Sequence, residues 1–160
     1  MKTNHKTFKD DRGSFTAIDS KYLDINWEQI NVVTNDNKFT FRGLHYQDSP
    51  AQTKCIKVIQ GKILDILVDL KTKEVKTFEL TNDEFLFVPN NYAHGYLTLE
   101  PNTIVTYLVK GRYNPDSEHS MVWKTIPKVK NIVDDYLQGC NIWISDNPAF
   151  SIQPSTTDFL

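Results

Sequence analysis

Five side chains that could take part in chemistry lie within runs that otherwise read as β-strands: His45, Lys54, Asp65, His94 and Tyr107. A polar side chain on the inward face of a strand costs free energy unless it binds a ligand or pairs with another polar group. A neutral imidazole in a partly dry cavity is a suitable general base near neutral pH. These residues therefore predict a ligand site inside the fold, with His45 as the candidate for proton transfer.

Each candidate also has a purely structural interpretation. Taken alone, Tyr107 reads as a core aromatic, Lys54 as a solvated residue at a strand edge, and His94 as a turn histidine bonded to backbone. Asp65 and Asp69 either orient His94 or Lys54 or are simply solvated. The residues by themselves leave these alternatives open.

A metal site is the other chemistry that histidines in a small β-barrel can support. It requires a His-x-His pair or a carboxylate in register with a histidine. Position 47 is Gln, and the next histidine after His45 is His94. His5 and His119 stand in polar, loop-like contexts, where we expect them to be solvated. We therefore expect neither a metal nor another cofactor.

The elements that position these residues are strands. Between residues 63 and 70, both polar residues fall on one face of a period-two pattern, which marks a β-strand, and Gly61 marks the turn before it. One face of this strand is aliphatic: Leu64, Ile66, Val68 and Leu70. We expect that face to pack into a sheet sandwich. The opposite face carries Asp65 and Asp69 and is expected to look onto water or a polar cavity.

Further β-rich runs cover residues 29–34, 39–46, 75–80, 85–88, 93–99 and 103–109, separated by clusters of Asn, Asp, Pro and Gly. Many short strands at even spacing favour an antiparallel sandwich or small barrel, an all-β fold. Helical signal is limited to two turns at 129–137, stopped at Gly139, and one turn within 19–27. The tail after Pro148 reads as irregular. No repeat or linker divides the chain, so we expect a single domain over residues 1–160.

The run from Phe41 to Gln47 presents a choice of faces. Alternation places Phe41, Gly43, His45 and Gln47 on one face. Arg42 and Tyr46 then point the other way, unless a bulge at Gly43 re-aims them.

Composition excludes several classes of protein. The 160 residues carry a formal net charge of -2, so no basic field favours nucleic acid, and an anionic ligand needs a few placed cations. No apolar run approaches the roughly 20 residues that cross a bilayer. The first 11 residues lack the apolar core of a signal peptide. Cys55 and Cys140 form no CxxC pair and are expected to be reduced thiols of a cytoplasmic protein.

An ordered series of motifs resembles one family. Residues 41–47, Phe-Arg-Gly-Leu-His-Tyr-Gln, resemble the RGLHxQ signature of the dTDP-4-dehydrorhamnose 3,5-epimerase family. In the family's order, residues 11–15 resemble DxRGxF, 29–31 QxN, 52–54 QxK, 61–69 GxxxDxxVD, 88–96 IPxGxAHGF, and 107–115 YK…YxP. The resemblance is good from about Asp11 to Trp123 and loose in the tail. Several motifs in order are far more specific than any one alone.

This resemblance implies a double-stranded β-helix (a cupin or jelly-roll barrel) that forms a homodimer and uses no metal. It makes His45 the base that removes a proton at C3 or C5 of a sugar, and Tyr107 the acid on the opposite ring face. Lys54 stabilises the enolate oxygen at C4. The implied substrate-binding residues are Arg12, Gln29, Asn31, Arg42, Gln47, His94 and Tyr113.

The implied reaction is epimerisation of a nucleotide-linked 4-keto-6-deoxy sugar at C3, or at C3 and C5, in deoxysugar synthesis for surface polysaccharide. The keto group acidifies the hydrogens on both flanking carbons, and a fixed cation stabilises the resulting oxyanion. Two alternatives remain. A 3,4-ketoisomerase on the same scaffold typically shows a His-rich motif after Arg-Gly, which residues 44–47 do not match. The other alternative is a non-catalytic module that binds nucleotide sugars.

The sequence departs from the family's pattern near its end. There the catalytic histidine is paired with an aspartate of an SxKD-like segment, and the corresponding stretch here is Ser145-Asp146-Asn147-Pro148. In strict register the aspartate's place falls on Pro148, and a proline cannot orient an imidazole. We therefore expect Asp146 to serve if the chain shifts. Ala17 stands where the family has a glutamate.

Overall fold

The computed structural model describes residues 2–4, 6–11, 13–17 and 26–144. Its strands are β1 (Lys2–Asn4), β2 (Lys6–Asp10), β3 (Gly13–Ala17), β4 (Gln29–Asn35), β5 (Phe41–Gln47), β6 (Thr53–Gln60), β7 (Ile63–Asp69), β8 (Val75–Leu80), β9 (Glu84–Val88), β10 (Tyr92–Thr98), β11 (Thr103–Lys110) and β12 (Glu118–Ser120). The helices are η2 (Pro115–Ser117), η3 (Trp123–Thr125) and α1 (Pro127–Leu137).

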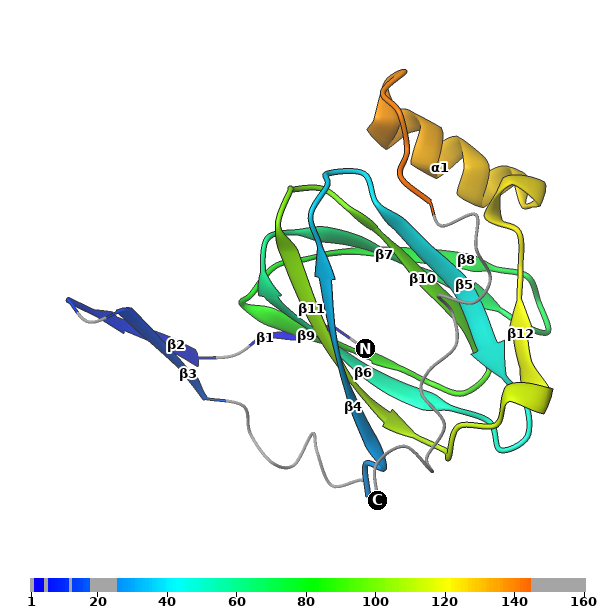
Figure 1. Cartoon of the computed structure of the whole chain (residues 1–160), viewed down its shortest axis with the longest axis horizontal. Coiled ribbons are helices and arrows are strands. Elements are labelled where there is room, and N and C mark those ends of the chain that lie inside the picture. The colour runs from blue at the N-terminus through cyan, green and yellow to red at the C-terminus, as the bar shows by residue number, and fades with distance from the viewer. Residues whose placement is uncertain (1, 5, 12, 18–25, 145–160) are drawn as a thin grey trace.

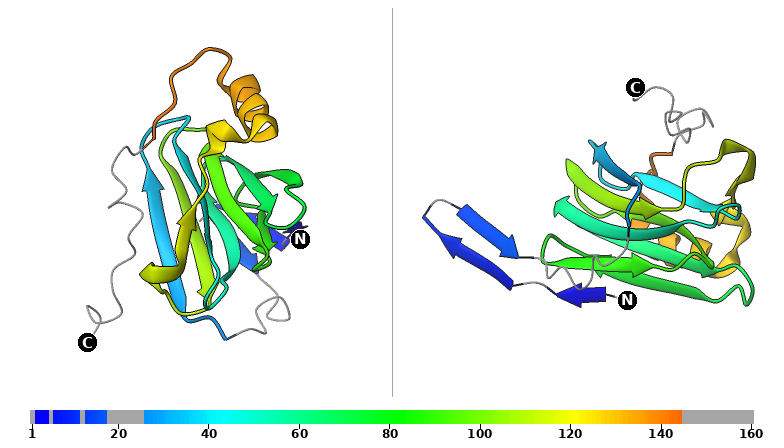
Figure 2. Two further views of the ribbon diagram at one scale, coloured as in Figure 1. Left: turned by 90° about the vertical axis from the view of Figure 1, so that its right-hand side faces the viewer. Right: turned by 90° about the horizontal axis from the view of Figure 1, so that it is seen from below.

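Two five-stranded antiparallel sheets face each other (Figure 1). One has the strand order β1-β9-β6-β11-β4 and the other β12-β5-β10-β7-β8, while β2 and β3 pair only with each other. In Figure 2 the β2–β3 hairpin projects away from the body that the two sheets form. The prediction of an all-β barrel with few short helices is confirmed.

Most predicted strands are observed within one or two residues of their expected bounds. The run at 75–80 is β8 without change, whereas the run predicted from residue 39 begins at Phe41. Phe39 has φ of 61°, a left-handed conformation that extended chain does not adopt, so the strand begins after it. The predicted turn within 19–27 falls mostly, and the tail after Pro148 wholly, outside the described residues.

Helix α1 begins two residues earlier than predicted. Pro127 stands in its first turn, where the missing N–H costs nothing. Val129, Val133 and Leu137, spaced four residues apart, bury one face of the helix. The left-handed Gln138, followed by Gly139 at φ of 84°, ends the helix as expected. No helix in the described part of the chain has the length and apolarity to cross a membrane.

The β12-β5-β10-β7-β8 sheet has an apolar cluster on each face. The cluster between the two sheets includes Ile56, Ile63, Leu67 and Val105. The second cluster lies on the other face, under α1 and η3: Phe41, Leu44, Leu64, Ile66, Val68, Val75, Ala93, Leu97, Trp123, Val129, Val133 and Leu137. The expectation that the aliphatic face of β7 packs between sheets is therefore wrong. That face packs against the helix, and the face carrying Asp65 lies inside the barrel.

A β-bulge in β5 sets which side chains point inward. His45 pairs with His94, but Arg42 pairs with Tyr96, so the register shifts by one residue between them. Gly43 has φ of 112°, and a Cβ there would lie 2.6 Å from the Cα of Gly95. Only glycine fits such a close approach of two backbones.

The bulge corrects the predicted faces of β5. Phe41 does not share a face with His45, because its ring lies 5.1 Å from that of Trp123 in the helix-side cluster. Arg42 instead comes to the interior side with His45, as the bulge alternative predicts. Arg42 and His45, three residues apart, therefore lie on the same side of the sheet.

Candidate active site

His45 is a partly buried residue of β5, paired with His94 of β10. Burial, helped by the nearby Lys54 and His94, lowers the pKa of its imidazole from 6.5 to about 4. Its Nδ1 atom lies 3.0 Å from Oγ of Ser120 on β12. A ring with this pKa is neutral at pH 7, which is the form a general base requires.

Lys54 on β6 faces His45 from the opposite sheet. It is only 9% exposed, so the alternative of a solvated strand-edge lysine is wrong. Burial lowers the pKa of its ammonium from 10.5 to about 8, and the carboxylates of Glu118 and Asp65 limit that fall. A buried ammonium of this kind interacts strongly with any negative charge that forms beside it.

Tyr107 on β11 lies next to Lys54. Its strand partner is Ile56, two positions along β6 from Lys54, so the lysine and the phenol are diagonal neighbours on one face. Burial raises the pKa of the Tyr107 hydroxyl, Arg42 opposes this rise, and Glu118 adds to it. The hydroxyl therefore keeps its proton at neutral pH and can donate it.

His94 and Asp65 form a buried pair beside His45. The His94 Nε2 atom lies 2.8 Å from Oδ2 of Asp65, and Asp65 is fully buried. The interpretation of His94 as a turn histidine bonded to backbone is therefore wrong, because it is a strand residue oriented by a carboxylate. Asp69 instead accepts hydrogen bonds from the backbone of Lys71 and Thr72 in the turn after β7.

Arg42 stands at the mouth of the barrel. Its Nε donates to Oδ1 of Asn35 at 2.7 Å, and the Asn35 amide in turn donates to the backbone oxygen of Thr103. Burial raises the pKa of both Tyr96 and Tyr107, and the Arg42 guanidinium opposes each rise, which places its charge near both rings. It also lines a cleft with Thr34, Asn35, Asp36, Asn37, Thr40, Phe41, Trp143 and Ile144.

Gln29 and Asn31 lie together on β4, which is the outer strand of its sheet. The Gln29 Nε2 atom donates to Oδ1 of Asn31 at 2.7 Å. Asn31 is the strand partner of Tyr107. Its Nδ2 atom is buried and has no hydrogen-bond partner within the described ranges. These two amides therefore adjoin the region that contains Lys54 and Tyr107.

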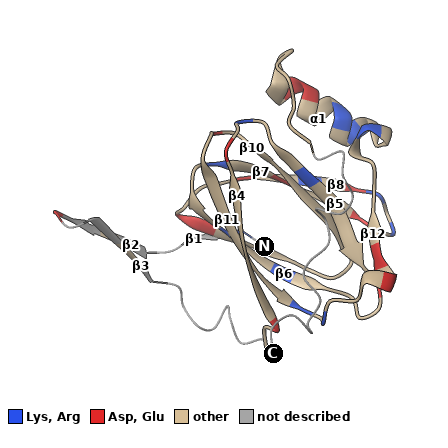
Figure 3. Ribbon diagram, in the orientation of Figure 1, with Lys and Arg blue, Asp and Glu red and all other residues tan. Residues whose placement is uncertain are grey.

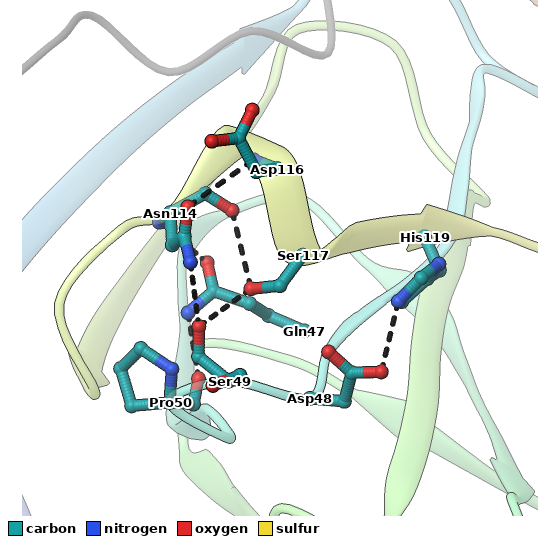
Figure 4. A network of polar contacts seen from close by, with 8 residues as sticks. All are labelled: Gln47, Asp48, Ser49, Pro50, Asn114, Asp116, Ser117 and His119. Atoms are coloured by element: carbon teal, nitrogen blue, oxygen red, sulfur yellow. Dashed lines mark hydrogen bonds and ion pairs between the residues drawn. The ribbon is translucent and has the colours of Figure 1, made fainter.

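The Gln47 side chain forms hydrogen bonds with backbone groups. Its Nε2 donates to the backbone oxygen of Pro50 and its Oε1 accepts from the backbone N–H of Asn114 (Figure 4). Its Nε2 also donates to the backbone oxygen of Arg112. The contacts to Arg112 and Asn114 tie the chain before η2 to the end of β5, and the contact to Pro50 holds the turn after β5. The Gln47 amide thus contacts backbone groups, and substrate binding by Gln47 stays a prediction.

Two residues of the short strand β12 were not anticipated from the sequence. Glu118 accepts a hydrogen bond from the Tyr113 hydroxyl at 3.0 Å and acts on the pKa of Lys54 and Tyr107. Ser120 contacts His45. A three-residue strand carries too little alternation to be detected, and its pairing with β5 is a tertiary contact. Only the nearby YxP resemblance marked this region.

Of the other predicted residues, Arg12 and Asp146 lie outside the described ranges, as does Pro148. Within the described ranges, no group of three or more His, Cys, Asp or Glu side chains is arranged to hold a metal ion. In Figure 3, Lys, Arg, Asp and Glu occupy only short stretches of the described strands.

The geometry can be compared with known proteins. The model of the dTDP-4-dehydrorhamnose 3,5-epimerase family matches residues 1–132. A dTDP-4-dehydrorhamnose 3,5-epimerase of Neisseria gonorrhoeae is 31% identical over 134 residues, which are 74% of this chain and 40% of that protein. One of Methanothermobacter thermautotrophicus is 28% identical over 130 residues, 74% of this chain and 70% of that protein. The match thus spans less than half of one relative's length and about two thirds of the other's.

Solved structures of the family have the same fold. A dTDP-4-dehydrorhamnose 3,5-epimerase of Bacillus anthracis, with TDP and PPi bound, superposes with a TM-score of 0.75 at 33% identity, covering 96% of this chain and 92% of that one. The epimerase of Mycobacterium tuberculosis has a TM-score of 0.77 at 26% identity, covering 98% and 84%. Fold, ordered motifs and family model agree, and the chain belongs to the dTDP-4-dehydrorhamnose 3,5-epimerase family.

Proposed function

We propose that this protein is a metal-independent epimerase that inverts C3, or C3 and C5, of a nucleotide-linked 4-keto-6-deoxy sugar. One observation carries the proposal: a neutral imidazole, a buried ammonium and a protonated phenol lie close together on strands of two facing sheets. His45 is on β5 of one sheet, and Lys54 and Tyr107 are on β6 and β11 of the other.

Inversion at carbon needs a base on one face of the sugar ring and an acid on the other. A ring held between the two sheets has His45 on one side and Tyr107 on the other. His45 takes the proton from the carbon beside the ketone, and the electron pair of the broken C–H bond moves onto the ketone oxygen. Tyr107 then donates its proton to the same carbon from the opposite face. Each such group is worth about 10²–10⁴ in rate.

Lys54 stabilises the enolate in this mechanism. Because its ammonium is buried, little water screens the attraction between it and the oxyanion at C4. A preorganised donor of this kind contributes about 3–4 kcal/mol to the stability of the transition state. Asp65 and His94 line the same interior, where the oriented imidazole of His94 is a further donor for the sugar.

The nucleotide diphosphate would occupy the mouth of the barrel. Arg42 supplies a cation there, and Asn31 has a buried amide nitrogen without a partner among the described residues. Gln29 and, by resemblance, Arg12 complete the set, and Tyr113 adjoins it through Glu118. The TDP bound to the Bacillus anthracis relative favours a thymidine nucleotide.

A homodimer is part of the proposal. On the outer face of β4, Ile30 and Val32 are 65% and 68% exposed, an apolar surface that a second copy would cover. The β2–β3 hairpin, which carries the DxRGxF motif, projects away from its own barrel and bears exposed Phe8 and Phe15. The family resemblance implies that Arg12 helps to hold the nucleotide across the dimer interface. Val32→Lys is expected to yield monomer in light scattering after gel filtration, whereas Lys128→Glu on α1 is expected to leave the dimer intact.

Two further expectations belong with this function. Residues 1–160 act as a single domain, since the described residues of the proposed site lie on the two sheets or, for Tyr113, in the segment that joins β11 of one sheet to β12 of the other. The reaction takes place in the cytoplasm, in keeping with Cys55 and Cys140, which are both free thiols in the structure.

The test follows hydrogen exchange directly. The protein is incubated in deuterated water with thymidine-diphosphate 4-keto-6-deoxyglucose, and the C3 and C5 proton signals are recorded by NMR. Loss of both signals supports 3,5-epimerisation, and loss at C3 alone supports a single-site enzyme. A carbonyl that moves from C4 to C3 would instead identify a ketoisomerase. Binding without exchange at either carbon would leave only the non-catalytic module.

A further inference from the structure

The contact between Ser120 and His45 is built into the sheet. Ser120 and His45 are strand partners in the β12–β5 ladder, so their side chains leave the same face side by side. The Ser120 hydroxyl oxygen lies 3.0 Å from Nδ1 of the imidazole. One nitrogen of the ring is therefore committed to β12, and Nε2 is the nitrogen that remains for chemistry.

The short strand that carries Ser120 is firmly held. Figure 4 shows the Ser117 hydroxyl and the Asn114 amide donating to the backbone oxygen of Ser49, at 2.6 and 2.8 Å, while Gln47 accepts from the Asn114 backbone. On the other side of Ser120, the Met121 N–H donates to the backbone oxygen of Leu44 at 2.9 Å. Because both ends of β12 are tied to β5 or its following turn, the hydroxyl has a defined position relative to the ring.

We propose that Ser120 is the positioning residue of the base: its hydroxyl accepts a hydrogen bond from Nδ1–H of His45 and so holds the ring in the tautomer whose Nε2 lone pair removes the substrate proton. This inference rests on the proposed function. In the family's pattern an aspartate is the partner of this histidine, and in strict register its place in this sequence falls on Pro148. Ser120 supplies a partner for the imidazole from a different part of the chain.

The chemistry of a hydroxyl partner differs from that of a carboxylate. During proton abstraction the C–H electron pair goes to the enolate and the proton goes to Nε2, while the Nδ1–H to Oγ bond persists. Ser120 is neutral, so it fixes the tautomer but adds no negative charge to balance the imidazolium. Among the described residues, the ionisable groups that act on the pKa of the ring are Lys54 from β6 and His94 from β10, and both disfavour its protonation. Glu118 of β12 acts instead on Lys54 and Tyr107.

The test uses ¹⁵N NMR of the histidine rings in the full-length protein, with His45→Asn to assign the signals of His45. In the unsubstituted protein we expect Nδ1 of His45 to be protonated and Nε2 to be unprotonated at pH 7. Ser120→Ala is expected to give a mixture of tautomers and to slow proton exchange into the substrate about 3- to 10-fold, the value of one hydrogen bond. Ser120→Thr, which keeps the hydroxyl, is expected to restore both.

A fourth variant tests charge. Ser120→Asp adds a carboxylate beside Nδ1 and is expected to move the pKa of His45 from about 4 back toward 6.5, seen as a displaced NMR titration and a displaced acid limb of kcat/KM. Thr125→Ala is the matched control, because that hydroxyl is exposed and donates to the backbone oxygen of Val122 in its own turn. It is expected to leave tautomer and rate unchanged.

Two results would overturn the inference: a proton on Nε2 of His45 in the unsubstituted protein, or an unchanged tautomer in Ser120→Ala. Both readouts are independent of catalysis. If the unsubstituted protein exchanged no substrate hydrogen, the proposed function would fail, and the ¹⁵N spectra would still decide whether Ser120 positions the ring.

Discussion

The β12-β5-β10-β7-β8 sheet has an apolar cluster on each face, and the two clusters differ in what they contain. The helix-side cluster, between this sheet and α1, consists of aliphatic and aromatic residues such as Leu44, Ile66 and Val133. The cluster between the sheets adjoins Asp65, Lys54 and His94, all of them buried. Burying those groups opposes folding, so the apolar residues between the sheets offset a cost that the helix-side cluster does not carry.

The difference between the two clusters indicates that the functional groups of this fold lie between the sheets. A buried charge persists only where the rest of the structure compensates for its desolvation. If the two regions have separate tasks, substitutions inside the barrel should change catalysis, whereas substitutions under the helix should change folding.

The largest expected effect comes from the base. His45→Asn removes the group that takes the proton, so exchange at C3 is expected to fall about 10²- to 10⁴-fold while the thermal unfolding midpoint stays close to that of the unsubstituted protein. Deuterium incorporation followed by NMR, together with a circular dichroism melt, measures both. Near-native exchange at C3 in this variant would show that the base is another residue.

Lys54→Met sharpens the comparison because activity and stability should move in opposite directions. Loss of the ammonium is expected to slow exchange about 10²- to 10³-fold. Folding no longer has to bury a charge, so the free energy of unfolding is expected to rise by about 1–3 kcal/mol, consistent with a lysine pKa lowered from 10.5 to about 8. Urea denaturation measures the change. A less stable Lys54→Met protein would contradict the expectation that burying the Lys54 ammonium lowers the free energy of unfolding.

Ile66→Ala tests the helix-side cluster. Ile66 is fully buried there, and truncation is expected to lower the free energy of unfolding by about 2–5 kcal/mol. The rate per folded molecule is expected to be unchanged at a temperature where the variant remains folded. Activity lost without loss of stability would show that the two faces of the sheet are not separate in function.

The smallest effect is on pH dependence. The pKa of His45 is lowered to about 4, so its base form is lost only as the pH falls through about 4, and activity is expected to persist well below pH 6.5. At the other end, the Lys54 ammonium is lost as the pH rises through about 8, and activity should fall there. A profile of kcat/KM against pH measures both limbs. An acid limb near 6.5 would mean that His45 is not desolvated.

Much of this arrangement could be predicted from the sequence. The strands showed their period of two, helix α1 showed its four-residue spacing of apolar positions, and the motif series grouped His45, Lys54 and Tyr107 in one predicted site. These signals are local, or come from motifs in a fixed order, so they do not depend on knowing which strands pair. Gln47 belonged to the same motif, yet its side chain holds backbone, a distinction that a motif cannot make.

What the sequence determined by itself is the longer strands of the two sheets, helix α1, the all-β class, the family and the chemical types in the site. Tertiary structure alone decided which face of β7 points inward, that the bulge at Gly43 turns Arg42 toward the side of His45, and that Ser120 reaches the imidazole. A period-two pattern shows that a strand has two faces. Which face lies inside the barrel depends on the elements that cover each face, and those elements are distant in the chain. The helix that covers Ile66 begins at Pro127, about 60 residues later.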